Sequence, residues 1–307
     1  MPMLPVRDLG KVGIYPDANP YELPINAFSD GSNIIFDEGK VQRAPVFKKL
    51  YGDFKSSLSV DAVSGDYDTS TKTYENILGS SGTSRFVCSY NTSTEVIVVC
   101  DTNGKVREYP NGSFADVTPG VTTVTNDEPW THTQVAGLSV LARKGSIPYI
   151  RNIKSDSTYY GMGGDWPATT TCAVSRGFLD FIICLNVSAG ANEYPTMVKW
   201  CNPLTFSPAI SSINWDPSNT AYIAGENILG DMRTPILDGL PLHNTFMIYS
   251  SDQVWGMEYT GSNLVFNFKR LFQSTGIMNT NCVVEVEGKH MVFGTDDIFM
   301  HDGVSKK

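Results

Sequence analysis

A hairpin-like phrase recurs five times along the chain. Each copy has an apolar run of about four residues, a polar or glycine-containing turn, and a second, alternating run. This combination is the sequence signal of a β-hairpin. The five copies are VIVVCDTNGKVREYPNG from Val96, LSVLARKGSIPYIRN from Leu138, DFIICLNVSAGANEYPTMVKWCNP from Asp180, TFMIYSSDQVWGMEYTG from Thr245 and HMVFGTDDIFMHDG from His290.

The copies are spaced almost evenly. The distance is 42 residues from Val96 to Leu138, 43 from Leu138 to Phe181 and 45 from Phe246 to Met291. One longer gap of 65 residues contains the polar insert SPAISSINWDPSNTAYIAGENILG. This period is typical of β-propeller blades, small sheets that bury their apolar faces only against the next blade. The spacing therefore predicts an all-β, β-propeller-like repeat of hairpin blades, with a β-sandwich of coincidental spacing as the alternative.

Composition agrees with a turn-rich β protein. The 307 residues include 27 glycines and 17 prolines, and only 18% are charged. The net charge is -9, and no cluster of Lys and Arg suits a protein that grips nucleic acid through its phosphates. No apolar run reaches the roughly 18 residues of a membrane span, and the first residues lack a signal-peptide core. We therefore expect a soluble protein made in a cytoplasm.

The first residues differ from the rest in composition. Residues 1–57 are rich in Pro and Asn and contain one clear hairpin, NIIFDEGKVQRAP, so we expect a platform or docking segment there. Residues 58–307 then form the propeller-like domain. Its last blade has too few strands, and we expect another segment to complete it. The candidates are the early strand Arg85–Tyr90, which is the first choice, the hairpin Asn33–Arg43, or a separate polypeptide.

Catalytic chemistry is weakly signalled. The motif GMGGDW has the wrong spacing for a phosphate-binding loop, and DYDTSTKTYEN lacks the glycine and closing glutamate of a calcium loop. Asp296, Asp297 and Asp302 read as turn residues beside His301. The histidines and cysteines show no ligand spacing, and the cysteines read as small buried hydrophobes. We therefore predict no catalytic residue, no metal, no cofactor and no enzymatic activity.

Four aromatic residues are candidates for contact with a partner. Tyr159, Tyr160 and Trp166 lie in the polar loop 154–171, and Trp215 lies in the polar insert. Large aromatic residues on loops can anchor a binding partner. The equally weighted alternative is that each of them folds back onto its own blade.

Three stretches of the chain resemble the tail nozzle proteins of short-tailed bacteriophages, also called tail tubular protein B. These are VRDLGKVGIYPDANPYELPINAFSDGSNIIFDEGKVQRAP, the run from SRGFLDFIICLNV through YPTMVKWCNP to INWDPSNTAYIAGENIL, and the long run from DGLPLHNTFMIYSSDQVWG to MHDG. The resemblance implies a β-propeller joined to a platform segment. It also implies a homo-hexameric ring that retains and then conducts the phage genome.

The same resemblance implies the partners and the location. They are other copies of the chain, the portal or adaptor ring, tail fibre or needle proteins, and DNA that passes without specific binding, all within the virion tail after assembly in the host cytoplasm. Nozzle chains usually continue well beyond this length, which leaves a complete nozzle, a short variant and a piece of one as alternatives.

An acidic protein suits a DNA conduit because an acidic wall repels phosphates and lets the duplex slide. Two other functions remain open. One is a propeller enzyme that degrades host polysaccharide, a glycoside hydrolase that would need two carboxylates roughly 5 to 10 Å apart. The other is a carbohydrate- or protein-binding propeller module that displays the loop aromatics.

Overall fold

The computed structural model describes the greater part of the chain. The described residues are 84–91, 95–109, 115–121, 124–262, 264–295 and 297–306, with residues 14, 23–24, 27–28, 34–37, 40–43, 67–68 and 73–74 nearer the N-terminus. Two compact units divide the chain, Met1–Ser56 and Ser57–Lys307. No helix in these described ranges is long and apolar enough to cross a membrane.

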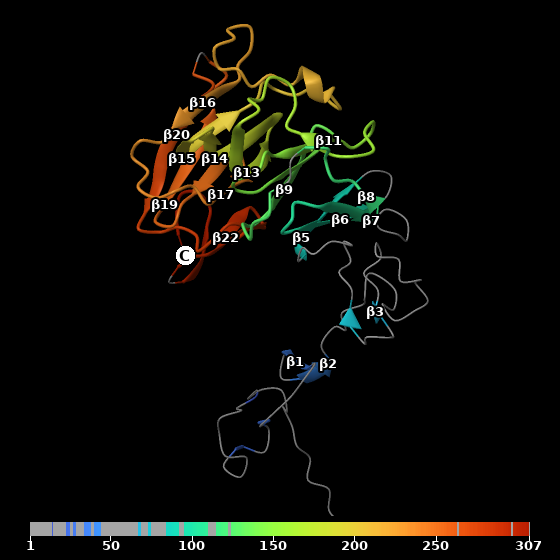
Figure 1. Ribbon diagram of the computed structural model, residues 1–307. Coiled ribbons are helices and arrows are strands. Elements are labelled where there is room, and N and C mark those ends of the chain that lie inside the picture. The colour runs from blue at the N-terminus through green and yellow to red at the C-terminus, as the bar shows by residue number, and fades with distance from the viewer. Residues whose placement is uncertain are drawn as a thin grey trace, which may run out of the picture. The chain divides into compact units, whose positions relative to one another are not determined.

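The second unit is a five-bladed β-propeller built from antiparallel sheets (Figure 1), which confirms the predicted fold. Blade 1 contains β5 (Ser84–Asn91), β6 (Glu95–Asp101), β7 (Val106–Tyr109) and β8 (Ala115–Asp116), and blade 2 contains β9 (Thr131–Val135), β10 (Leu138–Ala142), β11 (Tyr149–Asn152) and β12 (Tyr160–Gly161). Blade 3 contains β13 (Thr170–Phe178), β14 (Phe181–Ala189), β15 (Asn192–Trp200) and β16 (Gly225–Ile228), and blade 4 contains β17 (Asp238–Leu242), β18 (Thr245–Tyr249), β19 (Gln253–Tyr259) and β20 (Phe266–Gln273). Blade 5 contains β21 (Val283–Val286), β22 (Lys289–Phe293) and β23 (Ile298–His301).

All five predicted hairpins are present, and each is the second and third strand of one blade. They are β6–β7, β10–β11, β14–β15, β18–β19 and β22–β23. The polar insert lies within blade 3, between β15 and β16, and carries the single helical turn of the described residues, η1 (Ile210–Ser212). The first strands of blades 2 to 5 contact one another in sequence, β9 with β13, β13 with β17 and β17 with β21, so they surround the centre of the propeller.

Apolar clusters fill the interfaces between successive blades. One cluster joins blades 1 and 2 around Trp130 and Tyr149, and a second joins blades 2 and 3 around Ile182. A third joins blades 3 and 4 around Phe246, and a fourth joins blades 4 and 5 around Val292. Each fully buried aliphatic or aromatic side chain contributes about 1.5–3 kcal/mol. The blades therefore stabilise one another through their faces, as the repeat pattern predicts.

The last blade has three strands, and its completion differs from the first-choice expectation. Strand β5, which includes the early strand, pairs with β6 inside blade 1, so the prediction that it completes the last blade is wrong. Strand β6 follows β5 directly in the chain, and pairing with it costs less entropy because only a short loop is closed. The outer edge of β23 has one bridge, from His301 to Lys306. Completion by a separate polypeptide stays a prediction.

The first unit contains the expected hairpin, β1 (Ile34–Asp37) with β2 (Lys40–Arg43). A bridge joins Ile14 to Phe28, and within the second unit β3 (Tyr67–Asp68) pairs with β4 (Thr73–Tyr74). The remainder of the expected platform segment and most of the connecting stretch lie outside the described residues. The role of residues 1–57 as a platform stays a prediction.

Candidate functional site at the propeller centre

A buried ion pair lies among the first strands of the blades. Arg176 of β13 donates from Nε to Oδ1 of Asp238 and from Nη2 to Oδ2, both at 2.9 Å, and Asp238 begins β17. The Asp238 side chain is fully buried. Two parallel hydrogen bonds between a guanidinium and a carboxylate form the strongest geometry available to such a pair. The pair therefore joins blades 3 and 4 at the centre.

Asn281 extends this ion pair to blades 5 and 2. Its side-chain oxygen accepts from Arg176 at 2.8 Å, and its backbone N–H donates to Asp238 at 2.8 Å. Its amide nitrogen donates to the carbonyl of Trp130 at 2.9 Å, while Arg176 also donates to the carbonyl of His132 at 2.9 Å. We call Arg176, Asp238, Asn281 and these two carbonyls the central network. It ties four of the five blades together with charge-assisted hydrogen bonds.

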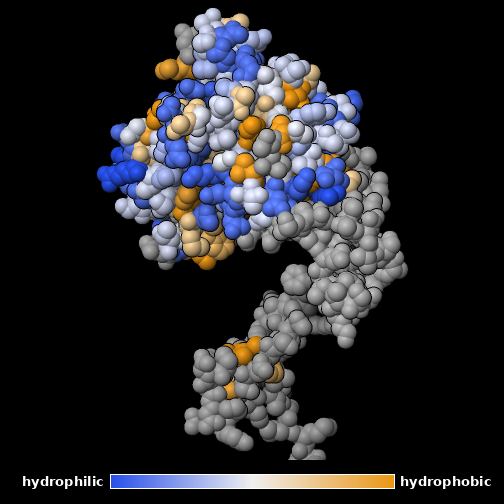
Figure 2. Space-filling model, viewed as in Figure 1, coloured by the Kyte–Doolittle hydropathy of each residue, from blue (hydrophilic) through white to orange (hydrophobic). Residues whose placement is uncertain are grey.

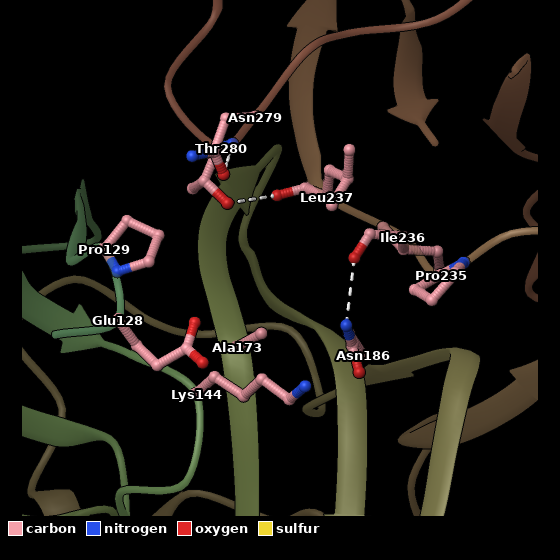
Figure 3. A pocket seen from close by; sticks show the side chains of 10 residues that line it. All are labelled: Glu128, Pro129, Lys144, Ala173, Asn186, Pro235, Ile236, Leu237, Asn279 and Thr280. Atoms are coloured by element: carbon pink, nitrogen blue, oxygen red, sulfur yellow. Dashed lines mark hydrogen bonds between the residues drawn. The ribbon is translucent and has the colours of Figure 1, made fainter. Parts of the chain in front are cut away.

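A small cavity is lined by residues from the same segments as the central network (Figure 3). Four of its lining residues precede members of the network by one to three positions in the chain. These are Pro129, Ala173, Leu237 and Thr280. The cavity therefore lies at the mouth of the propeller centre, and its lining residues neighbour the network in the chain.

The cavity has a volume of about 200 Å³. Glu128 and Lys144 both line it, and both are exposed (Figure 3). Asn186 reaches it from a bulge of β14, where a positive φ of 54° suits an asparagine, and donates to the carbonyl of Ile236 at 3.0 Å. Ligand pockets for drug-sized molecules usually measure about 300–1,000 Å³. This mouth is smaller and suits a single small polar group.

A second, wider hollow runs along the outer edge of blade 2. It has a volume of about 480 Å³ and is lined by Asn152, Asp156, Tyr160, Gly163 and Ile210 among others. The Asp156 carboxylate accepts from the backbone N–H of Asn152 at 2.9 Å and from the hydroxyl of its neighbour Ser155 at 3.0 Å. That carboxylate therefore stabilises the loop that forms one wall.

Of the four predicted partner-contact aromatics, only Tyr160 is exposed, at 48%, and it lines this hollow. Tyr159 is fully buried between blades, and its hydroxyl bonds Ser139 at 2.7 Å. Burial raises the pKa of Tyr159 well above its ordinary value. The prediction that Tyr159 stands exposed on a loop for a partner is therefore wrong.

Trp166 and Trp215 are also buried, and the prediction is wrong for them too. Their rings meet edge to face with centroids 4.7 Å apart, although one lies in the loop and the other in the insert. Trp166 also donates from its indole to the carbonyl of Thr170 at 2.9 Å. Burying two large rings against each other outweighs displaying them, because each removes a large apolar area from water. The alternative expectation, that these residues fold back onto the blades, describes both.

The polar cluster near the C-terminus is engaged in turns. Asp297 pairs with Lys306 at 3.2 Å, and Asp302 accepts from the backbone of Val304 and Ser305 at 2.9 and 2.7 Å. These backbone donors lower the pKa of Asp302 to about 2. Asp296 lies outside the described residues. Over the described ranges, no three His, Cys, Asp or Glu side chains gather as metal ligands.

Sequence reasoning missed the central network and a buried group between blades 4 and 5, Tyr249 with His290 and His301. The available signal was a charged residue inside an otherwise apolar strand, as in VSRGF around Arg176 and LDGLP around Asp238. Such charges are seldom buried unless they are paired. The partners lie 62 residues apart in the chain, so the pairing itself could not be read from spacing.

The visible surface of the propeller mixes polar and apolar side chains (Figure 2). Exposed large apolar residues occur in several blades, among them Val87, Leu264 and Ile298. Apolar residues scattered in this way are ordinary on a protein surface. The surface by itself therefore does not select a partner.

No family model matches the chain, and no curated protein matches it. Among solved structures, the chain is similar to one from the yeast Nup82–Nup159–Nup116 nucleoporin complex, with 6% identity, 72% of this chain and 74% of the other covered, and a TM-score of 0.43. It is also similar to Raptor from Chaetomium thermophilum, with 11% identity, 71% of this chain and 20% of the other covered, and a TM-score of 0.39. Similarity at this level carries no functional information.

Proposed function

We propose that this chain is a structural subunit of the tail nozzle of a short-tailed bacteriophage, and that six copies form a ring that retains and then conducts the genome. The proposal rests on the position in the fold of the residues that resemble nozzle proteins. Residues 175–203, 213–229 and 238–303, which resemble nozzle proteins, make up most of three successive blades, 3 to 5. A propeller is the architecture that this resemblance implies.

The central network bears on the route of the DNA in this proposal. Arg176, Asp238 and Asn281 bridge the propeller centre at hydrogen-bond distance, so a duplex does not pass through the middle of one subunit. The conduit is then the space enclosed by the ring of copies, and each propeller forms part of its wall. With a net charge of -9 per chain, a ring of copies repels phosphates where its carboxylates face inward.

Immunogold labelling of phage particles tests the location. An antibody raised against the whole chain is applied to intact particles and to particles stripped of their tails. We expect label at the tail, on the particle axis, and its loss with the tail. Label on the capsid surface, or label that persists without the tail, would contradict a nozzle role.

The hollow on blade 2 favours a second candidate, a propeller that binds carbohydrate or protein. Tyr160 offers an exposed ring beside a polar wall, which is the kind of surface that anchors a partner. In this case Tyr160→Ala should abolish binding to host-cell polysaccharide. Tyr222→Ala is the matched control, because Tyr222 is 46% exposed but does not line the hollow.

A polysaccharide-degrading enzyme remains the third alternative. Each of the two described cavities is lined by one carboxylate residue, Glu128 at the propeller mouth and Asp156 at the hollow. Glycoside hydrolysis usually needs two carboxylates within one cleft. Release of reducing sugar from host polysaccharide separates this candidate from the other two.

A further inference from the structure

Three polar rings meet inside the apolar interface between blades 4 and 5. The Tyr249 hydroxyl, on β18, lies 2.6 Å from Nδ1 of His290 and 2.7 Å from Nε2 of His301, on β22 and β23. All three residues are at most 1% exposed. Val292 and Phe299 are buried beside them in the same interface.

The backbone groups that bond the two histidines fix the direction of every hydrogen bond among the three rings. The carbonyl of Pro241 can only accept, so His290 carries its proton on Nε2, 2.9 Å away, and leaves Nδ1 as an acceptor for the Tyr249 hydroxyl. The backbone N–H of Gly303 donates to Nδ1 of His301 at 3.1 Å, so His301 carries its proton on Nε2 and donates to the tyrosine oxygen. Both histidines are therefore neutral, and every donor has one acceptor.

Protonation of either ring breaks this arrangement. A second proton on His301 must go to Nδ1, where it faces the N–H of Gly303. A second proton on His290 must go to its own Nδ1, which can then no longer accept from the Tyr249 hydroxyl. The other ring, His301, already donates to the Tyr249 oxygen, so the hydroxyl proton is left without an acceptor in the group. Each event loses a hydrogen bond and leaves a charge in an apolar interface, where an unpaired charge is costly.

The surrounding charges do not compensate for burial. Burial lowers the pKa of His301 to about 4, reinforced by His290 and opposed by Asp302. Burial also lowers the pKa of His290, opposed by the Pro241 carbonyl and Glu285 and reinforced by His243. Two further charged groups are near. Asp238 acts on Tyr249, and the Lys306 ammonium lies 3.2 Å from Asp297 and 4.2 Å from the centre of the Phe299 ring, while its backbone forms a bridge with that of His301.

We propose that Tyr249, His290 and His301 form an acid-sensitive lock that holds blade 5 against blade 4 while both histidines are neutral and releases it when they take up protons. An unfolded histidine titrates near pH 6.5. The folded pKa values lie below that, so the opened state binds more protons and becomes favoured as the pH falls from about 6.5 towards 4. The inference does not depend on the proposed function.

Hydrogen exchange followed by mass spectrometry tests the lock in the full chain. Protection of residues 283–301 is compared with that of residues 181–200 of blade 3 at about pH 7.5 and about pH 5. We expect blade 5 to lose roughly tenfold or more of its protection relative to blade 3 at the lower pH. Equal protection ratios at both pH values would overturn the proposal.

Three variants assign the effect to these rings. The double variant His290→Asn with His301→Gln keeps an acceptor and a donor for Tyr249 but cannot titrate, so the selective loss should vanish. His301→Gln alone should give an intermediate loss, and it serves as the test if the double variant does not fold. His132→Gln removes a half-buried histidine of blade 2 whose pKa is also lowered, and it should leave the loss unchanged. An undiminished loss in the His301→Gln variant would overturn the proposal.

Discussion

At the scale of single residues, Arg176 and Asp238 are the pair on which the centre of the propeller depends. The Asp238 carboxylate accepts four hydrogen bonds, from the Nε and Nη2 of Arg176 and from the backbone N–H groups of Gly239 and Asn281. A buried charge whose partner is removed keeps its desolvation cost without its compensation. The network is therefore sensitive to the loss of one partner and tolerant of the loss of both.

We expect Arg176→Met to lower the free energy of unfolding by about 3–5 kcal/mol, because Asp238 remains buried and unpaired. The double variant Arg176→Met with Asp238→Leu should recover most of that loss. Lys269→Met is the control, since its ion pair with Glu258 is largely exposed and should contribute less than about 1 kcal/mol. Urea denaturation measures all three, and equal losses for Arg176→Met and Lys269→Met would refute the central role of the pair.

A second residue-scale prediction concerns His132. Burial, reinforced by Arg176, lowers the pKa of His132 to about 4, and its Nε2 lies 3.0 Å from the Ser139 hydroxyl. Since the unfolded histidine takes up its proton near pH 6.5, the stability it contributes is complete above that pH and is lost as the pH falls towards 4. His132→Gln should therefore flatten the dependence of the urea midpoint on pH across this window, and a midpoint profile parallel to the wild type would contradict it.

At the scale of elements, the sequence predicted what is local and missed what is distant. The hairpins were predictable because each is encoded by an apolar run, a turn and an alternating run within about twenty residues. The burial of Trp166 was not, because its partner Trp215 approaches from an insert 49 positions later. The same limit applies to the central network, whose members come from four blades.

Gly164 shows how tightly the loop and the insert pack. Its φ is +69°, and a Cβ there would lie 1.7 Å from the carbonyl oxygen of Ile213. We expect Gly164→Ala to cost roughly 3 kcal/mol or more and to weaken the near-ultraviolet signal of the tryptophan pair. Gly230→Ala, which would meet nothing within 4 Å, should change stability by less than about 0.5 kcal/mol. Indistinguishable costs for the two variants would show that the close packing is not required.

Deleting residues 290–307 removes two strands and uncovers the interface of blade 4. Val292 and Phe299 are buried there, and each such side chain contributes about 1.5–3 kcal/mol. We expect the melting temperature to fall by roughly 10 °C. Truncation after Gly303 is the control, because Val304 is 88% exposed and its loss uncovers no core. An unchanged melting temperature for the larger deletion would mean that the last hairpin does not support the propeller.

At the scale of the whole molecule, the proposed function rests more on composition and on the resemblance than on the geometry of one subunit. The net charge of -9 sets the sign of the field around a ring of copies, but the sequence does not determine which carboxylates face inward. The proposed function requires that Asp and Glu outnumber Lys and Arg along the lumen. A lumen lined mainly by Lys and Arg would hold the duplex through its phosphates and would contradict passage by sliding.

The most direct test of the account is a single-particle reconstruction of the phage tail at side-chain resolution. The account predicts six copies of the chain around the particle axis, each with a five-bladed propeller whose centre is closed by Arg176, Asp238 and Asn281, and with DNA running through the ring rather than through any propeller. A chain that occurs as a single copy away from the axis, or that is absent from the tail, would contradict the nozzle assignment.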